Sequence, residues 1–157
     1  MSPEKQNLVI LPASPHEKEC LDLLVQLNSE LVEKYPDELR GSPLIPNDLS
    51  GTNATFLVAR IDGQLAGCGA IRPLAPGVAE VKRMFVVQHA RGHGVGRAIL
   101  ESLESFAKKC GYRAIRLETG LKQPEAISLY ETAGYVRAPC YGPFRENSMS
   151  VCFEKQI

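Results

Sequence analysis

The sequence has no tryptophan, few other aromatic residues and no excess of either charge. Aromatic side chains make up 6% of its 157 residues, and eighteen basic residues balance eighteen acidic ones. No long run of one charge occurs, so neither a nucleic-acid surface nor a polybasic membrane patch is indicated. No apolar stretch approaches the ~20 residues of a membrane-spanning helix, and the first seven residues lack the apolar run of a signal peptide. We therefore expect a cytoplasmic protein that binds neither nucleic acid nor membrane.

The five cysteines are scattered and include no Cys-x-x-Cys pair. An odd number without such a pair argues against a disulfide framework and against a structural zinc site. We therefore expect reduced thiols and no bound metal, with Cys68, Cys110 and Cys152 packed as small apolar residues.

Length and apolar spacing predict one domain over residues 1–157, with hydrophobic residues at 44% of the chain. Ser14-Pro15 is expected to open a helix that runs through Val32, and Asp62-Gly63 is a strong signal for a tight hairpin. Strands are expected at residues 8–11, 55–61, 65–72, 79–87, 114–119 and 148–153, and the other helices at 94–110 and 124–133. This order, β-α-β-β-β-α-β-α-β, predicts an α+β domain with a mostly antiparallel sheet.

The segment 35–51 carries three prolines and two glycines, which interrupt regular structure. A loop of this length in a compact domain is more often functional than not. Its acidic residues Asp37, Glu38 and Asp48 suit either a cationic ligand or simple solvation.

A glycine-rich loop, Arg91-Gly92-His93-Gly94-Val95-Gly96, precedes the helix expected at 94–110. Glycines allow close approach of the backbone, and a helix N-terminus adds unpaired N–H groups that suit a pyrophosphate. Arg91 and Arg97 add full charges at the same place. A tight turn that serves only packing remains the alternative, because a short glycine loop alone is a weak signal.

Two nucleotide-binding motifs fit this loop poorly. A P-loop requires Lys followed by Ser or Thr, which does not occur here. A Rossmann motif has the spacing Gly-x-Gly-x-x-Gly in a parallel βαβ unit. Here the spacing is Gly92-x-Gly94-x-Gly96, and three antiparallel strands are expected before it.

Two motifs together resemble those of the GNAT acetyltransferases. Arg91-x-x-Gly94-x-Gly96 is similar to the family's Arg/Gln-x-x-Gly-x-Gly/Ala loop, and the segment 123–135, QPEAISLYETAGY, is similar to its second signature. Gln123 stands where many members have Asn, and it offers the same amide donor and acceptor. The resemblance implies a three-layer fold, a central mixed sheet flanked by helices, and acetyl-CoA as co-substrate without a metal. The cofactor-binding residues it implies are Phe85, Val86, Arg91, Gly92, His93, Gly94, Val95, Gly96, Arg97, Gln123 and Ala126.

The same resemblance assigns catalytic roles. The backbone N–H of Val86 would polarise the thioester carbonyl, and Tyr130 would protonate the departing thiolate. The alternative for Tyr130 is packing against the coenzyme arm. Glu80 is the candidate base, or else a solvent-facing carboxylate paired with Lys82 or Arg83.

The acceptor is expected to be a primary amine of a small molecule that attacks acetyl-CoA directly in a ternary complex. Glu118 is a second candidate base or a site for a cationic substrate, and Phe144 is a candidate wall of the acceptor site. A protein amine as acceptor and a non-catalytic acyl-CoA sensor remain alternatives. A homodimer is also open, because many members of the family dimerise.

Overall fold

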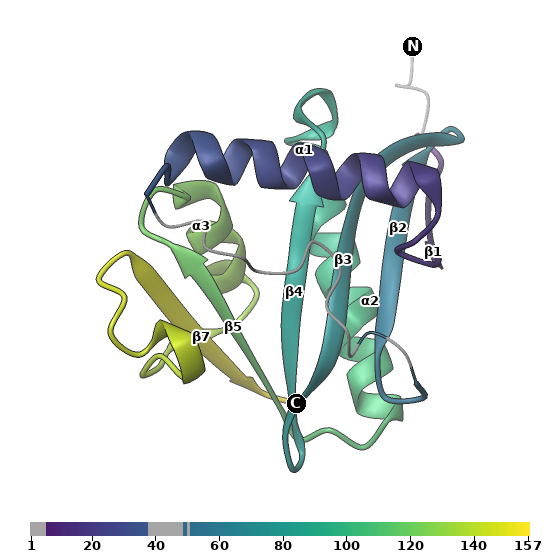
Figure 1. Ribbon diagram of the computed structural model, residues 1–157. Coiled ribbons are helices and arrows are strands. Elements are labelled where there is room, and N and C mark those ends of the chain that lie inside the picture. The colour runs from purple at the N-terminus through teal and green to yellow at the C-terminus, as the bar shows by residue number, and fades with distance from the viewer. Residues whose placement is uncertain (1–5, 38–48, 50) are drawn as a thin grey trace.

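The computed structural model describes residues 6–37, 49 and 51–157. Most of the predicted loop at 35–51, including Glu38 and Asp48, lies outside the described residues. Figure 1 shows the arrangement of the elements. The strands are β1 (Leu8–Pro12), β2 (Thr55–Ile61), β3 (Gln64–Ala75), β4 (Val78–Val86), β5 (Ala114–Gly120), β6 (Val136–Arg137) and β7 (Ser150–Gln156). The helices are α1 (Lys18–Lys34), α2 (Val95–Lys109) and α3 (Pro124–Thr132), with short 3-10 turns η1 (Gln88–Ala90) and η2 (Gly142–Phe144).

The described strands form one sheet in the order β1-β2-β3-β4-β5-β7-β6. Only β4 and β5 pair in parallel, and every other neighbouring pair is antiparallel. The predicted mixed, mostly antiparallel sheet is confirmed. Several details differ: β6 was not predicted, β3 extends to Ala75 rather than ending at Arg72, and the last strand runs over Ser150–Gln156 rather than 148–153.

Helices cover both faces of this sheet (Figure 1). α2 buries a full apolar stripe against it, including Ile99, Leu100 and Leu103, each 0% exposed. α1 crosses the opposite face near the upper edge and buries Leu23 and Leu24 there. The three-layer arrangement implied by the resemblance is therefore present.

The two predicted turn signals had different outcomes. Asp62 and Gly63 both have positive φ, at 49° and 83°, and β2 and β3 pair directly across them at Ile61 and Gln64. The first helix, in contrast, begins at Lys18 rather than next to Ser14-Pro15. Ser14 Oγ instead accepts a hydrogen bond from the His16 N–H at 3.3 Å, so it caps a turn before the helix.

β4 is irregular where it approaches its end. Opposite Gly69 of β3, two residues of β4, Arg83 and Met84, occupy the place of one, which is a β-bulge. Arg83 has a φ of 58°, a left-handed conformation that costs of order 1–3 kcal/mol for a residue other than glycine. The parallel pairing of β4 with β5 ends at Val81 and Leu117. Beyond this point the two strands diverge and leave a V-shaped opening in the sheet.

The prediction of reduced cysteines is wrong for two of the five residues. Cys140 and Cys152 form a disulfide with their Cα atoms 5.1 Å apart, whereas Cys20, Cys68 and Cys110 are free. The antiparallel pairing of β6 with β7 continues to Ala138, whose N–H donates to the Cys152 carbonyl at 3.0 Å. That pairing brings Cys140 beside Cys152, so Cys152 is not a simple apolar packing residue. Cys110 is only half-buried, and the buried thiol that fits the packing prediction is Cys68.

Across the described residues, no helix combines the length and the apolar character needed to cross a membrane.

Candidate functional site

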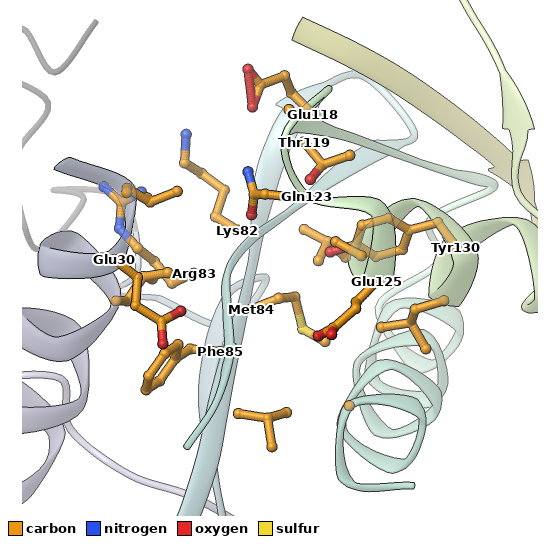
Figure 2. Close-up of a pocket in the computed structure, with 18 of the residues that line it drawn as sticks. Glu30, Lys82, Arg83, Met84, Phe85, Glu118, Thr119, Gln123, Glu125 and Tyr130 are labelled. Atoms are coloured by element: carbon orange, nitrogen blue, oxygen red, sulfur yellow. The ribbon is translucent and has the colours of Figure 1, made fainter. Parts of the chain in front are cut away.

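A cavity of about 820 Å³ fills the opening between β4 and β5. It is bounded by α1 on one side and by α3 and the start of α2 on the other, and Figure 2 shows 18 of the residues that line it. Of the fifteen candidate site residues, all line this cavity except His93. Residues far apart in the sequence are therefore brought together as one site, and His93 is exposed in its loop.

The glycine-rich loop forms a sharp turn into α2. Gly92 and Gly94 have φ values of 82° and 78°, a region that favours glycine. The first hydrogen bond inside the helix runs from the Ala98 N–H to the Gly94 carbonyl at 3.0 Å. The preceding amides, at Val95, Gly96 and Arg97, therefore point out of the helix start. This end of the cavity is suited to an anion such as a pyrophosphate.

The Arg91 side chain holds this loop to two other elements. Its Nε donates to the Val86 carbonyl at 2.9 Å, and one terminal nitrogen donates to both carboxylate oxygens of Glu30 at 2.7 and 2.9 Å. Its guanidinium lies 5.7 Å from the Phe85 ring centre. Arg91 was expected to supply charge to the phosphate loop, and in this structure its charge is directed to Glu30 of α1.

The other predicted cation of the loop also has protein partners. Arg97 Nε lies 3.3 Å from Glu101 and its Nη1 donates to the Thr132 carbonyl at 3.4 Å, both at the surface. In this structure the loop therefore presents mainly backbone amides at the cavity.

The amide of Val86 faces the opening in the sheet. The next residue, Val87, donates its N–H to the Ala66 carbonyl of β3 at 2.9 Å. Because successive residues of a strand direct their amides to opposite edges, the Val86 N–H is directed away from β3. On that side β5 has already parted from β4. A backbone donor is thus aimed into the cavity, as an oxyanion-binding group requires.

The start of α3 is held by a contact with Tyr35, the residue that follows α1. The Tyr35 hydroxyl accepts the Lys122 N–H at 2.8 Å, and a Cβ added at Gly120 would overlap that hydroxyl. Gln123 follows as the N-cap residue of α3, and its carbonyl accepts the Ile127 N–H at 3.1 Å. Gly120 is thus required where β5 ends, and the turn places Gln123 on the cavity wall.

Tyr130 lies on α3 with its ring packed between Tyr135 and Phe153, whose ring centres are each 5.9 Å away. It is 5% exposed and reaches the cavity wall (Figure 2). Burial, and secondarily the charge of Glu118, raises the pKa of Tyr130 above its ordinary value of 10.0. The phenol is therefore protonated at neutral pH and able to donate a proton.

Glu80 does not face solvent, so the alternative of an exposed strand-end carboxylate is wrong. It is 2% exposed, and Tyr141 Oη donates to its Oε2 at 2.6 Å. Arg72 Nε donates to its Oε1 at 2.9 Å, and the Lys82 Nζ lies 3.9 Å from the same oxygen. Glu80 is thus a buried carboxylate with a hydrogen-bond donor on each oxygen.

The far end of the cavity is lined by groups from β5, β7 and the η2 segment. Ser150 Oγ donates to Glu118 Oε2 at 2.7 Å. The Phe144 ring packs edge-on against Tyr141, with ring centres 5.7 Å apart, and the Lys82 Nζ lies 5.8 Å from the Phe144 ring centre. Glu118 and Phe144 thus both lie at the end opposite the glycine-rich loop.

Cys68 does not line this cavity and is buried in the core of the sheet. Cys68 is 0% exposed, and burial raises the pKa of its thiol to about 12, so the nucleophilic thiolate is scarce at neutral pH. Within the described part of the chain, no group of three or more His, Cys, Asp or Glu side chains is placed to hold a metal ion.

Sequence reasoning missed two residues that shape the site. Glu30 holds Arg91 and Tyr141 holds Glu80, and each pair is separated by 61 residues in the sequence. Neither Glu30 nor Tyr141 belongs to a recognisable motif, so only the folded chain reveals these contacts.

A mixed sheet that opens beside a glycine-rich helix start, with a backbone donor and a phenol facing one cavity, is the arrangement that an acyl-group transferase requires. The Acetyltransferase (GNAT) family matches residues 19–135. An IAA acetyltransferase of Azospirillum brasilense is 37% identical over 152 residues, covering 96% of this chain and 99% of that protein. The chain therefore belongs to the GNAT acetyltransferase family and is an acyltransferase.

Other relatives agree with this assignment. The uncharacterized N-acetyltransferase YsnE of Bacillus subtilis is 32% identical over 111 residues, covering 69% of this chain and 74% of its own. A structure of an acyl-CoA N-acyltransferase candidate from Klebsiella pneumoniae superposes with a TM-score of 0.79 at 29% identity, over 95% of this chain and 97% of that one. A GNAT family acetyltransferase from Elizabethkingia anophelis with acetyl-CoA bound shares the fold, with a TM-score of 0.70 at 18% identity over 98% and 100% of the two chains.

Proposed function

We propose that this protein transfers the acetyl group of acetyl-CoA to the primary amine of a small molecule by direct attack in a ternary complex. The observation that carries this proposal is that the Val86 amide and the Tyr130 phenol face one cavity, next to the open N-terminus of α2. Support for acetyl-CoA comes from the family and from the Elizabethkingia structure that holds it. We also propose the cytoplasm as its compartment. The free thiols of Cys20, Cys68 and Cys110 favour it, whereas the Cys140–Cys152 disulfide is a feature more common in oxidising compartments.

The cavity offers a place for each part of acetyl-CoA. The amides of Val95, Gly96 and Arg97 would hold the pyrophosphate, while Gln123 and Ala126 would contact the pantetheine arm. When bound, acetyl-CoA supplies an activated thioester carbonyl next to Val86. Phe85 and Val86 lie beyond the point where β4 parts from β5, so they border the space for that carbonyl.

The reaction forms one C–N bond and breaks one C–S bond. The neutral amine attacks the thioester carbon, and the Val86 N–H stabilises the negative charge that develops on the carbonyl oxygen. As the C–S bond breaks, the Tyr130 hydroxyl gives its proton to the departing sulfur. The products are the N-acetylated amine and the free thiol of coenzyme A. The proton that the amine loses goes to a carboxylate or to water, and Tyr130 is reprotonated from solvent.

Glu80 and Glu118 are both candidates for that proton acceptor. Arg72 and Tyr141 already donate to the two oxygens of Glu80, so proton transfer to Glu80 must displace a bond or pass through water. Glu118 is held by Ser150 and lies farther along the cavity. Replacing each by Gln and recording kcat/KM against pH separates the two roles, because the variant that lacks the base loses the acidic limb of the profile.

The test is thiol release from acetyl-CoA with a panel of amines, using wild type, Tyr130→Phe and the control Tyr112→Phe. IAA is tested beside the amines because the Azospirillum brasilense relative is named an IAA acetyltransferase. Loss of a general acid is expected to lower kcat about 100-fold. Affinity for acetyl-CoA should change less than about twofold, since the ring contacts of Tyr130 remain. The Tyr112 hydroxyl donates to the Asn53 carbonyl outside the cavity, so its loss should leave kcat unchanged.

Three results would argue against the proposal. Unchanged kcat in Tyr130→Phe removes the acid role and leaves Tyr130 as a packing residue. Tight acetyl-CoA binding without acetylation of any small amine favours a protein acceptor or a sensor module. Absence of acetyl-CoA binding contradicts the proposed co-substrate itself.

A further inference from the structure

The backbone of Val86 directs both of its polar groups into the opening of the sheet. Val86 lies opposite Gly67 of β3. The adjacent ladder bond runs from the Val87 N–H to the Ala66 carbonyl at 2.9 Å, so the residue pair beside it makes none. The N–H and the C=O of Val86 therefore both face away from β3, toward the side where β5 has parted from β4.

The Val86 carbonyl would work against acetyl transfer if it had no partner. Its oxygen carries a partial negative charge, and negative charge also develops on the thioester oxygen at the N–H of the same residue. Arg91 removes this conflict, because its Nε donates to the Val86 carbonyl at 2.9 Å. The guanidinium thereby lies on the same side of β4 as the oxyanion-binding amide, where a positive charge stabilises the transition state.

Glu30 of α1 holds the Arg91 side chain in this position. One terminal nitrogen of Arg91 donates to both carboxylate oxygens of Glu30, at 2.7 and 2.9 Å. Figure 2 shows Glu30 extending from α1 toward the end of β4 that carries Phe85, whose ring centre lies 5.7 Å from the guanidinium. The planar guanidinium is thus held between an acceptor on α1 and an acceptor at the end of β4.

The pyrophosphate of acetyl-CoA would compete for the same guanidinium. Arg91 begins the loop whose backbone amides would hold that anion, and guanidinium groups bind phosphate oxygens well. Glu30 also lines the cavity and opposes this displacement with its own negative charge. The Arg91 and Glu30 side chains are 34% and 36% exposed. A ligand that fills the cavity would exclude water from both, which strengthens their attraction.

We propose that Glu30 is a positioning residue for acetyl transfer: through Arg91 it keeps the Val86 carbonyl paired and leaves the Val86 N–H to the thioester oxygen. Arg91 then serves the oxyanion-binding amide as well as the loop that it begins. The acceptor end of the cavity, at Phe144, lies opposite this loop, so the role of Glu30 is distinct from acceptor binding. This inference rests on the proposed acetyl transfer and adds one residue to its machinery.

Glu30→Ala and Glu30→Gln test this role through kcat and the affinity for acetyl-CoA. Without the carboxylate, Arg91 is free to turn to the pyrophosphate, so the affinity should stay the same or rise. In Glu30→Ala, kcat for the best amine of the panel should fall about tenfold, which is less than the ~100-fold or more that loss of an oxyanion donor costs. Glu30→Gln keeps one acceptor oxygen and should lose less. A general structural defect would weaken cofactor binding as well.

The carbonyl stretch of bound acetyl-CoA reports the polarisation at Val86 directly. Acetyl-CoA that is isotope-labelled at the thioester carbonyl is bound without an acceptor, and its infrared spectrum is compared with that of the unlabelled compound. In wild type the stretch should lie below that of free acetyl-CoA, because a hydrogen bond from Val86 weakens the C=O bond. In Glu30→Ala it should move back toward the free value.

Two further comparisons locate the effect at Arg91. Glu19→Gln is the matched control, because Glu19 of α1 also pairs with an arginine, Arg60, and neither lines the cavity. It should change neither kcat nor the carbonyl stretch. Arg91→Lys keeps a positive charge but loses the planar fork, so it should also lower kcat. In the double variant with Glu30→Gln the two losses should not add, since both break the same contact.

The outcomes separate this inference from the proposed function. Unchanged kcat and an unchanged carbonyl stretch in Glu30→Ala overturn the inference and leave acetyl transfer intact. Weaker acetyl-CoA binding together with a lower Tm also overturns it, because Glu30 then only stabilises the fold. If no amine is acetylated although acetyl-CoA binds, the proposed function fails, and the infrared comparison alone decides the role of Glu30.

Discussion

At the scale of single residues, Tyr135 stands out because its hydroxyl is buried without a hydrogen-bond partner. Among the residues that the structure describes, the Tyr135 Oη is the one buried side-chain nitrogen or oxygen that lacks a hydrogen-bond partner. The residue is 3% exposed, and its ring packs edge-on against Tyr130. A polar group that has lost water without gaining a partner lowers the stability of the folded chain.

We predict that Tyr135→Phe leaves the protein as stable or makes it more stable, by up to about 1 kcal/mol. For a domain of this size that corresponds to a rise in Tm of about 2–4 °C, measured by circular dichroism at pH 7. The matched variant Tyr112→Phe loses a hydrogen bond to the Asn53 carbonyl at 2.8 Å and should lower Tm instead. A fall in Tm for Tyr135→Phe as large as that for Tyr112→Phe would contradict the prediction.

Whether a site residue could be predicted depends on how far apart in the sequence the residues that contact one another are. Gly94 and Gln123 belong to short motifs beside a helix start, so a local pattern was enough to place them on the cavity wall. The carboxylate of Glu80 was placed in the site, but its partners were not. Tyr141 and Arg72 reach it from other strands and loops, and their positions depend on the whole sheet.

At the scale of elements, the Cys140–Cys152 disulfide joins the segment before η2 to β7. That segment carries Tyr141, which donates to Glu80, and Phe144 at the cavity. The disulfide therefore restrains one wall of the acceptor end. Because its sequence separation is 12 residues, closing this loop should stabilise the fold by roughly 2–3 kcal/mol.

We predict three reactive thiols in the unreduced protein after denaturation, and five after treatment with a dithiol. Reduction should also lower Tm by several degrees. Cys140→Ser should reproduce this loss in the absence of reductant, whereas Cys110→Ser, which removes a free and half-buried thiol, should not. Five reactive thiols without reductant would show that the disulfide does not form in solution.

Some strands and turns could be predicted from local sequence patterns, and others could not. The turn of the β2–β3 hairpin was predicted at the right residues because Asp62 and Gly63 adopt the left-handed backbone that it requires, although β3 is longer than the predicted strand at 65–72. β6 was missed because two residues, Val136 and Arg137, carry no periodicity, and only the pairing with β7 makes them a strand. The bulge in β4 was also missed, since Arg83 is not a residue type that favours positive φ.

At the scale of the whole molecule, three buried tyrosines link stability to alkaline pH. Burial is the main cause that raises the pKa of Tyr130, Tyr135 and Tyr141 above the ordinary value of 10.0, with neighbouring acidic residues adding to it. Above about pH 10 the unfolded chain releases these protons while the folded chain retains them. The stabilisation is thus complete below pH 10 and is lost as pH rises above it.

We predict that the contribution of these tyrosines to the free energy of unfolding is constant up to about pH 9 and falls beyond pH 10. Each tyrosine contributes up to ~1.4 kcal/mol per pH unit in that range. Urea unfolding at pH 8, 10 and 11 measures the effect, and Tyr135→Phe should reduce the slope by about one quarter, because the buried Cys68 thiol, whose pKa is also raised, contributes a similar share. An unchanged slope in Tyr135→Phe would mean that this phenol titrates normally in the folded state.

The parting of β4 from β5 has a mechanical consequence. Four residue pairs, from Val78–Ala114 to Val81–Leu117, join two parts of the sheet that each carry one side of the cavity. Because the two parts of the sheet are joined only at this end, a small rotation of one part about the junction would change the distance between the far ends of β4 and β5 by a larger amount. The chain end lies beside it, where the Ile157 N–H donates to the Arg113 carbonyl at 2.9 Å. We therefore expect substitutions that alter packing at the junction, such as at Ala79 and Ile115, to change the width of the opening without contacting either substrate.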